Sequence, residues 1–299
     1  MTVRILQFGT TGQLARELLA QAGDFDVAIT ALSRAEVDFA DPQAAVRALR
    51  DAEADLVVIA AAYTAVDLAE SEPDLARTVN AVTPGAIAQA LGADGPALVH
   101  VSTDYVFDGE TGVPYVETDP THPINVYGAT KLAGEQAILA ACPRALILRT
   151  SWVVSSHGKN FVKTMLRLAG EGKPLKVVAD QFGRPTAARD LARFILSQAG
   201  RLAAAAPGDA VFGVHHFANA GEVTWKGLAE GVFALAMGDR APSVAAGATA
   251  DWPAPARRPI RGTLDTGKLE HTFGVTPRPW RDAVAEIVAE LTSEQRSTA

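Results

Sequence analysis

The sequence predicts an α/β fold in which a doubly wound parallel sheet is followed by a smaller C-terminal α/β lobe. Short apolar runs rich in β-branched residues alternate with helical stretches in the first half of the chain, a pattern typical of parallel strands joined by right-handed crossovers. A glycine-rich loop follows the first of these runs directly. After about residue 150 the alternation weakens, so we expect a first domain over residues 1–150 and a lobe over residues 151–299. Some later segments are expected to return to the first domain.

The individual elements follow from these patterns. Apolar runs predict strands over Val3–Phe8, Asp26–Leu32, Asp55–Ala60, Ala97–Ser102, Ala145–Thr150 and Leu175–Val178. Stretches rich in Ala, Leu, Glu and Arg predict helices over Gln13–Gln21, Pro42–Arg50, Val66–Glu70, Pro73–Leu91, Val126–Ala141, Asn160–Gly170, Ala188–Ala199 and Trp280–Leu291. The segment Ala241–Pro259 is rich in Ala, Gly and Pro, and no element is predicted there. In such a sheet, ligands bind beyond the carboxyl ends of the strands.

Composition excludes several classes of protein. The single cysteine, Cys142, excludes an intramolecular disulfide framework and a cysteine-rich metal site. No apolar run reaches the length of about 18 residues that predicts a membrane span. The 27 basic and 34 acidic residues give a net charge of −7, which argues against a nucleic-acid binder. The first residues, MTVRILQFG, lack the pattern of a signal peptide, so a cytoplasmic location is expected.

The glycine loop Gly9-Thr10-Thr11-Gly12-Gln13-Leu14-Ala15 lies between the first strand and the first helix. Glycines at such a turn let the backbone approach a pyrophosphate, which lies against the N-terminus of the helix. This arrangement predicts an NAD(P)-binding domain of the Rossmann type. The alternative is an ordinary strand-to-helix turn that happens to contain glycines.

The end of the second strand indicates which cofactor binds. An acidic residue there favours NAD, whereas an arginine favours NADP; this chain has Ser33 and Arg34. We therefore expect NADPH, with NADH as the alternative, and place Ser33 and Arg34 near the 2′-phosphate. The alternative for Arg34 is a solvated loop residue. Asp38 and Phe39 are expected to meet the adenine, and the small residues Ala60–Ala62 to let the cofactor pass.

Tyr127 and Lys131 lie four residues apart on a predicted helix and therefore share a face. A nearby ammonium lowers the pKa of a phenol, so that it can donate a proton and recover it near neutral pH. The strand Ala97–Ser102 brings Ser102 and Thr103 to the same edge of the sheet, where a hydroxyl can hold a substrate carbonyl. An exposed helical pair is the alternative for Tyr127 and Lys131.

The histidines give no catalytic or metal-binding pattern. His100 lies on a buried strand and is expected to be a core residue. The adjacent His215 and His216 would point to opposite faces of a strand, which argues against a shared metal site. No cluster or spacing typical of a metal centre occurs, so no metal is predicted.

Together, these motifs resemble the extended short-chain dehydrogenase/reductases that act on nucleotide-activated sugars, and most closely the dTDP-4-dehydrorhamnose reductase family. The matching segments are AAAYTAVDLAESE (60–72), VSTDYVFDG (101–109), NVYGATKLAGE (125–135), LRTSWV (148–153), NFVKTMLRL (160–168) and DQFGRPT (180–186), besides the glycine loop. The match is dense over roughly residues 1–190 and looser afterwards. The resemblance implies reduction of the C4 ketone of dTDP-4-dehydro-L-rhamnose to dTDP-L-rhamnose, the last step of dTDP-rhamnose biosynthesis.

The resemblance also implies roles for individual residues. Tyr127 would donate the proton, with Lys131 and Thr103 as its catalytic partners. Cofactor contacts would come from Gly9, Gly12, Gln13, Leu14, Ser33, Arg34, Asp38, Phe39, Ala60, Ala62, Tyr63, Thr64, Tyr127 and Lys131. The nucleotide sugar would contact Thr103, Asp104, Trp152, Asn160, Phe161, Lys163, Gln181, Arg184 and Thr186. For Trp152, the alternative is a packing role in the core or between the lobes.

Some members of the family bind Mg²⁺ through glutamates at a dimer contact. Glu17 matches one such ligand, but a second expected acidic position has Arg189, with Asp190 beside it. This departure favours a metal-free protein that is a monomer, with a weak homodimer as the alternative. Two other functions stay open: another nucleotide-sugar reductase or epimerase of the same fold, and a non-catalytic regulatory subunit that binds a dinucleotide.

Overall fold

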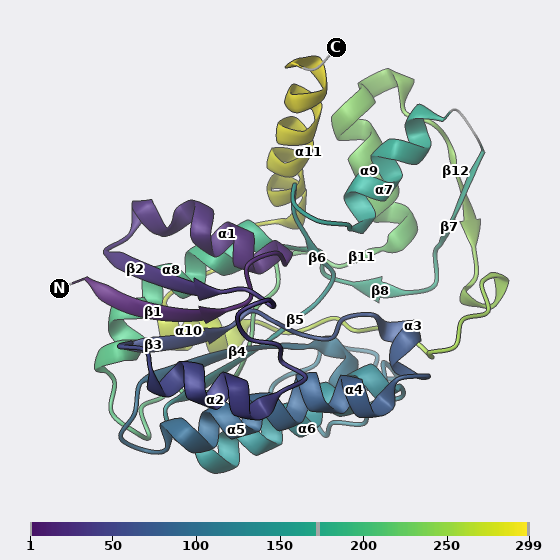
Figure 1. Ribbon diagram of the computed structural model, residues 1–299. Coiled ribbons are helices and arrows are strands. Elements are labelled where there is room, and N and C mark those ends of the chain that lie inside the picture. The colour runs from purple at the N-terminus through teal and green to yellow at the C-terminus, as the bar shows by residue number, and fades with distance from the viewer. Residues whose placement is uncertain (1, 172–173, 298–299) are drawn as a thin grey trace.

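The computed structural model describes residues 2–171 and 174–297 (Figure 1). In this part of the chain, six strands form a central parallel sheet: β1 (Val3–Phe8), β2 (Val27–Leu32), β3 (Leu56–Ile59), β4 (Ala97–Thr103), β5 (Ala145–Thr150) and β10 (Gly213–His216). Their order across the sheet is β10-β5-β4-β3-β1-β2. The order reverses beside β1, which is the topological switch point where doubly wound sheets bind ligands. The predicted α/β class is confirmed.

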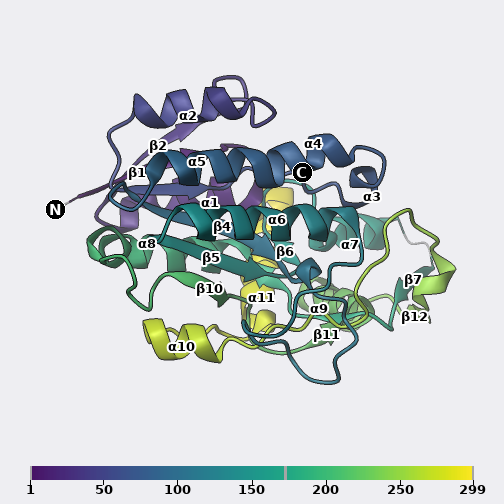
Figure 2. The same ribbon diagram turned by 90° about the horizontal axis from the view of Figure 1, so that it is seen from below.

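Helices cover both faces of this sheet (Figures 1 and 2). On one face lie α1 (Gln13–Gln21) and α8 (Ala188–Ala204), and on the other lie α2 (Pro42–Arg50), α5 (Thr83–Leu91) and α6 (Val126–Ala141). Shorter helices α3 (Val66–Ala69) and α4 (Pro73–Arg77) precede α5, which continues from α4 through a π-helical turn at Thr78–Val82. Two apolar cores, one for each face, bury nearly all side chains of β3 and β5.

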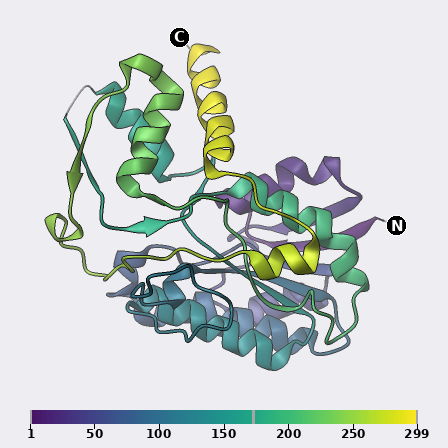
Figure 3. The ribbon, with the colours of Figure 1, turned by 180° about the vertical axis from the view of Figure 1, so that it is seen from behind.

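The second lobe stands beside the carboxyl ends of the strands, and Figure 3 shows it from behind. It contains helices α7 (Phe161–Gly170), α9 (Trp225–Met237) and α11 (Trp280–Ser297), and the parallel pair β7 (Leu175–Val178) and β12 (Val244–Gly247). Short strands β6 (Val153–Val154), β8 (Phe182–Gly183), β9 (Thr186–Ala187) and β11 (Val223–Thr224) connect the lobes. The lobe has its own core around Val232, Phe233 and Trp280.

Several local signals explain where these helices begin. The side chain of Asp41 accepts hydrogen bonds from the backbone N–H groups of Gln43 and Ala44 and so caps α2. Asn125 caps α6 through the N–H of Gly128, at 2.7 Å. Asn160 caps α7 in the same way through Lys163. The cap at Asn125 matters for the site because it fixes the first turn of α6, which contains Tyr127.

The sequence missed eight α-helices and strands: the two-residue strands β6, β8, β9 and β11, and four further elements. Strand β10 pairs with β5 at the edge of the sheet. It was not predicted because two of its four residues are histidines, which interrupt the apolar pattern of a strand. Helix α9 contains two glycines, and α10 (Gly267–Phe273) is short. Strand β12 lies inside Ala241–Pro259, where we expected no element. Its backbone is held in an extended conformation by pairing with β7, which the local sequence does not indicate. Helix α8 also extends five residues beyond the predicted Ala199.

Candidate active site

The glycine loop turns between β1 and α1 in a conformation that leaves the backbone exposed to a ligand. Gly9 has φ +101°, and a Cβ built there would lie 3.2 Å from the backbone nitrogen of Ala61. Gly12 is the N-cap of α1, and a Cβ built there would lie 3.7 Å from the carbonyl oxygen of Ala60. A methyl group at Gly9 would therefore be strained and crowded. The loop opens onto two adjoining cavities of about 280 and 500 Å³, which fit the two halves of a dinucleotide.

The smaller cavity contains most of the residues predicted to contact the adenosine. Arg34, Asp38, Phe39 and Tyr63 line it, together with Gly9 and Gly12. Arg34 is largely exposed, and its guanidinium lies 3.5 Å from the carboxylate of Asp38. Leu75 and Val79 add apolar surface that the sequence analysis did not assign.

Ser33, also placed near the 2′-phosphate, is already engaged by a neighbouring carboxylate. Its N–H and its hydroxyl both donate to Glu36, at 2.8 and 2.7 Å. These bonds lower the pKa of Glu36, with the hydroxyl bond the larger cause. A 2′-phosphate would therefore reach Arg34 more readily than Ser33.

The larger cavity brings the three predicted catalytic residues together. It is lined by Thr103 at the end of β4, by Tyr127 and Lys131 from α6, and by Gly12, Gln13 and Leu14 of the first turn. Ala60, Ala62 and Thr64 line the same cavity. The ring of Tyr105 meets that of Tyr127 edge to face, with centroids 5.7 Å apart. A local spacing on one helix and a strand end on another element thus form one site.

The electrostatics of the pair differ from our expectation. Lowered pKa was predicted for Tyr127, but burial raises it to about 12, and this effect outweighs the hydrogen bond from Thr103, which lowers it. Burial also lowers the pKa of Lys131 to about 8, with Glu135 opposing the shift. The prediction of a lowered phenol pKa was wrong for the protein alone, because desolvation favours the neutral form of both groups.

Asp104 is a buried carboxyl group within the site. It accepts a hydrogen bond from the hydroxyl of Thr103 at 3.1 Å, and that hydroxyl accepts one from the N–H of Tyr105. Burial raises the pKa of Asp104 to about 7. The carboxyl fits only because Gly262 faces it, since a Cβ there would lie 2.3 Å from a carboxylate oxygen.

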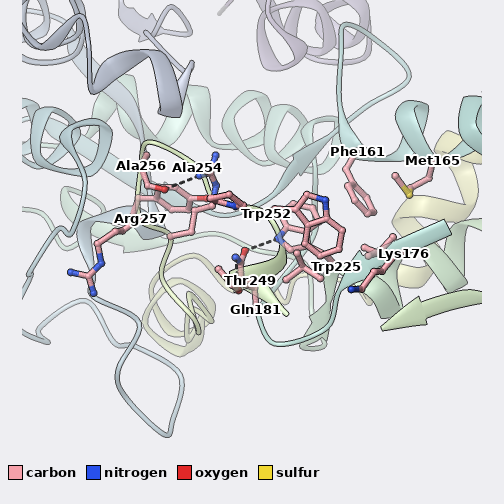
Figure 4. Close-up of a pocket in the computed structure, with 15 residues that line it drawn as sticks. Phe161, Met165, Lys176, Gln181, Trp225, Thr249, Trp252, Ala254, Ala256 and Arg257 are labelled. Atoms are coloured by element: carbon pink, nitrogen blue, oxygen red, sulfur yellow. Dashed lines mark hydrogen bonds between the residues drawn. The ribbon is translucent and has the colours of Figure 1, made fainter. Parts of the chain in front are cut away.

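A third cavity, of about 540 Å³, opens between the lobes (Figure 4). Its walls are aromatic and basic, with Phe161, Trp225, Trp252, Lys176, Arg257 and Arg258. In Figure 4, the indole of Trp225 donates to the side chain of Gln181, which in turn donates to Thr249. Tyr105 lines this cavity as well as the catalytic one, so the two spaces adjoin.

Trp152 separates the two spaces. It lines the catalytic cavity and stacks on Trp225 at a centroid distance of 3.6 Å. It has φ +46°, and a Cβ on Gly183 would lie 2.6 Å from its ring. A tryptophan rarely adopts such a backbone conformation, so the tight packing against Gly183 and Trp225 holds it in place.

Of four residues that we placed on the nucleotide side, two bind other protein groups and the other two are buried or partly buried. Asn160 donates to the side chain of Gln13 at 3.0 Å, and Lys163 donates to the carbonyl of Ser156. Thr186 is buried in β9, and the Nε of Arg184 is buried without a hydrogen-bond partner in the described structure. None of the four lines the three cavities described above, so their contact with a substrate stays a prediction.

Glu17, which matches a metal ligand of the family, is bridged to Glu290 by a guanidinium. Arg189 lies 2.7 Å from Glu290 and 3.6 Å from Glu17. The hydroxyls of Ser155 and Ser156 donate to the same two carboxylates. Over the residues described, no group of three or more His, Cys, Asp or Glu side chains has a metal-binding arrangement. These residues do not fit a divalent cation, because the positive charge of Arg189 already lies between the carboxylates.

A prediction follows from this arrangement. Removing divalent cations with EDTA should leave the melting temperature and the elution volume in size-exclusion chromatography unchanged. The Arg189→Glu variant replaces the guanidinium between Glu17, Glu286 and Glu290 with a fourth carboxylate, so Mg²⁺ should stabilise this variant and not the wild type. A fall of the wild-type melting temperature in EDTA would contradict the prediction.

Over the described ranges, no helix is both long and apolar enough to cross a bilayer.

Comparisons with known proteins agree with this geometry. The family described as RmlD substrate binding domain matches residues 3–293. A dTDP-4-dehydrorhamnose reductase of Sinorhizobium fredii is 43% identical, covering 98% of this chain and 99% of its own. One of Escherichia coli is 43% identical, covering 97% and 98%.

Solved structures give the same result. A dTDP-4-dehydrorhamnose reductase of Clostridium acetobutylicum has a TM-score of 0.89 at 35% identity and covers 97% of this chain and 99% of its own. One of Bacillus anthracis, solved in complex with NADP, has a TM-score of 0.89 at 31% identity, covering 97% and 100%. The match extends over nearly the whole chain and includes both lobes. The chain belongs to the dTDP-4-dehydrorhamnose reductase family.

Proposed function

We propose that the protein catalyses the NADPH-dependent reduction of the C4 ketone of dTDP-4-dehydro-L-rhamnose, which yields dTDP-L-rhamnose and completes dTDP-rhamnose biosynthesis. The observation that supports this most is that Thr103, Tyr127 and Lys131 line one cavity together with the glycine loop. The names of the curated relatives point to the substrate. The NADP in the Bacillus anthracis structure supports the cofactor.

The residues of the cavity supply what a ketone reduction needs. When bound, NADPH supplies the hydride that reduces the ketone carbon. Tyr127 donates a proton to the ketone oxygen as negative charge develops there, and Lys131 stabilises the phenolate that remains. General acid catalysis of this kind contributes about 10²–10⁴-fold to the rate. The high pKa of Tyr127 keeps its proton in place until the oxygen becomes basic.

Thr103 holds the ketone oxygen beside the phenol, and Asp104 decides whether its hydroxyl hydrogen is available. With Asp104 ionised, the hydroxyl of Thr103 donates to the carboxylate. With a proton on Asp104, the carboxyl group donates instead, and the hydroxyl hydrogen is released to the substrate oxygen. Because the pKa of Asp104 is about 7, both forms are populated near neutral pH.

The third cavity suits the nucleotide of the substrate. Its aromatic rings offer flat apolar faces for a base, and its cations attract a diphosphate. Trp152 lies between this cavity and the catalytic one, so it would pack against the sugar that connects the two. Binding energy from the nucleotide then orients the reacting carbon.

Two other functions are distinguished by one experiment. Oxidation of NADPH is followed with dTDP-4-dehydro-L-rhamnose and, in parallel, with its UDP analogue. Consumption with the dTDP sugar supports the proposal, and consumption with the UDP sugar alone indicates another nucleotide-sugar reductase. Absence of consumption with both favours a regulatory subunit that binds a dinucleotide. We further infer a cytoplasmic enzyme. We also infer a monomer or a weak homodimer, since Arg189 occupies the position where the family resemblance places an acidic metal ligand.

Cofactor preference gives a second test. We expect a higher kcat/KM with NADPH than with NADH, because Arg34 is exposed and can turn from Asp38 to a 2′-phosphate. Arg34→Ala should lower kcat/KM for NADPH roughly tenfold, the size of one lost charge-assisted hydrogen bond, and leave NADH unaffected. Arg47→Ala, which removes another exposed arginine that pairs with Asp41, is the control. A preference for NADH that persists in Arg34→Ala would contradict the assignment.

A further inference from the structure

His100 contacts the catalytic lysine, although the sequence indicates only a core residue. It lies in the middle of β4, in register with Ile59 on one side and Ile147 on the other, and is 1% exposed. Its Nε2 is 3.0 Å from the Nζ of Lys131. Because Lys131 lies on α6, the contact joins the sheet to the helix on which Tyr127 also lies.

The hydrogens of the ammonium can be accounted for one by one. An ammonium group has three N–H donors. One of them donates to the carbonyl of Val101 at 2.7 Å, and a second faces the Nε2 of His100. The third is left for the cavity that Lys131 lines. The two contacts on the strand therefore determine where the remaining donor points.

Other charged groups around Lys131 cannot take over this role. Glu135, one turn further along α6, is bound by the Nε and Nη2 of Arg149 at 3.0 and 2.7 Å. Asp104 and Tyr127 line the cavity itself. The ammonium is therefore held by a backbone carbonyl and an imidazole, without a carboxylate in direct contact among the hydrogen bonds of the described residues.

The imidazole is suited to accept a hydrogen bond from Lys131, but it is not suited to relay a proton. Burial and the charge of Lys131 lower the pKa of His100 well below its ordinary value, so the ring stays neutral. Its Nδ1 is buried and has no hydrogen-bond partner in the described part of the chain. A proton passed to the ring would therefore have no onward acceptor. The contact can therefore orient Lys131, but it cannot carry a proton away from the ammonium group.

We propose that His100 is a positioning residue of the active site, whose neutral Nε2 holds Lys131 so that one N–H points at the bound dinucleotide and the phenol. This inference depends on the proposed function in one respect, namely that Lys131 takes part in the reduction. The fixing of Lys131 itself can be measured without turnover.

Three variants test the proposal. His100→Leu removes the acceptor, whereas His100→Gln restores an acceptor on a side chain of similar reach. His215→Leu is the matched control: His215 is also buried on the sheet, but its Nε2 contacts the carbonyl of Ala210, away from the cavity. NADPH binding is measured by fluorescence, and kcat, KM and their pH dependence are measured with the ketone substrate.

We expect His100→Leu to weaken NADPH binding about 10–100-fold, the effect of losing a hydrogen bond to a charged group. The alkaline limb of its kcat/KM profile should move to lower pH, because the ammonium loses an acceptor. His100→Gln should recover most of the affinity, and His215→Leu should lose none. Unchanged NADPH affinity in a folded His100→Leu, or equal losses in His215→Leu, would overturn the proposal. If the wild type binds NADPH but reduces no sugar, the proposed function fails while this test remains valid.

A measurement on the unaltered protein covers the case in which His100→Leu does not fold. Nitrogen NMR of the labelled protein reports the tautomer and charge of His100. We expect a neutral ring with its hydrogen on Nδ1 from pH 5 to 9. A hydrogen on Nε2, or a protonated ring within this range, would refute the proposal because neither form can accept from Lys131.

Discussion

Tyr127→Phe should lose most of kcat for the proposed reduction and still bind NADPH. The substitution removes one oxygen atom and leaves the ring that packs edge to face on Tyr105. Without the phenol, only the hydroxyl of Thr103 remains beside the ketone oxygen, and it donates to Asp104 whenever that carboxyl group is ionised. General acid catalysis contributes about 10²–10⁴-fold, so kcat should fall by that factor.

The measurement is steady-state kinetics together with NADPH binding. Tyr115→Phe is the matched control: it removes a phenol that donates to Asp108 and lies outside the catalytic cavity. It should keep kcat and lose about 1–3 kcal/mol of stability for two hydrogen bonds, because the same hydroxyl also accepts from the N–H of Gly109. Turnover near that of the wild type in Tyr127→Phe would exclude this phenol as the proton donor.

The strands and helices of the first domain could be predicted because each is specified locally. The strands β3 and β5 are buried on both faces, so their sequences are continuous apolar runs. Strand β10 lies at the edge, and its histidines are buried through tertiary contacts with Phe107, Phe273 and Asp265. Strand β12 exists through its pairing with β7, which no local pattern indicates.

The same distinction between local and long-range signals applies to the residues of the site. Tyr127, Lys131 and Thr103 could be predicted to lie together because they belong to short motifs with a fixed spacing, and they do line one cavity. Residues that approach from distant segments were missed. Gly262 makes room for Asp104 across more than 150 positions of sequence, and Trp225 meets Trp152 only through the packing of the second lobe. A sequence shows which residues have suitable chemistry, and the fold decides which of them meet.

Glu135→Ala should be the most destabilising single change in the site region. The carboxylate of Glu135 and the guanidinium of Arg149 are 2% and 5% exposed. They share three contacts of 2.7–3.2 Å. Arg149 also lies over the ring of Phe107, 5.1 Å from its centroid. Removing one partner of such a pair leaves a buried charge without compensation and costs about 3–5 kcal/mol.

The same variant should alter Lys131, because Glu135 is the negative charge that raises the pKa of this lysine. With the carboxylate gone, that pKa falls further, and the alkaline limb of the kcat/KM profile should move to lower pH. Glu135→Ala thus links a stability effect to a catalytic one, and both are expected in the same protein preparation.

Urea unfolding measures the first effect, with Glu53→Ala as the control. Glu53 pairs with Arg4 at 2.7 Å, but its side chain is 88% exposed, and exposed pairs contribute about 0.2–1 kcal/mol. The double variant Glu135→Leu, Arg149→Met removes both charges and should recover most of the loss, since apolar residues of similar size replace such pairs at little cost. If Glu135→Ala is no less stable than Glu53→Ala, the pair does not hold α6 against β5, and the position of Lys131 must depend on its contacts with β4 alone.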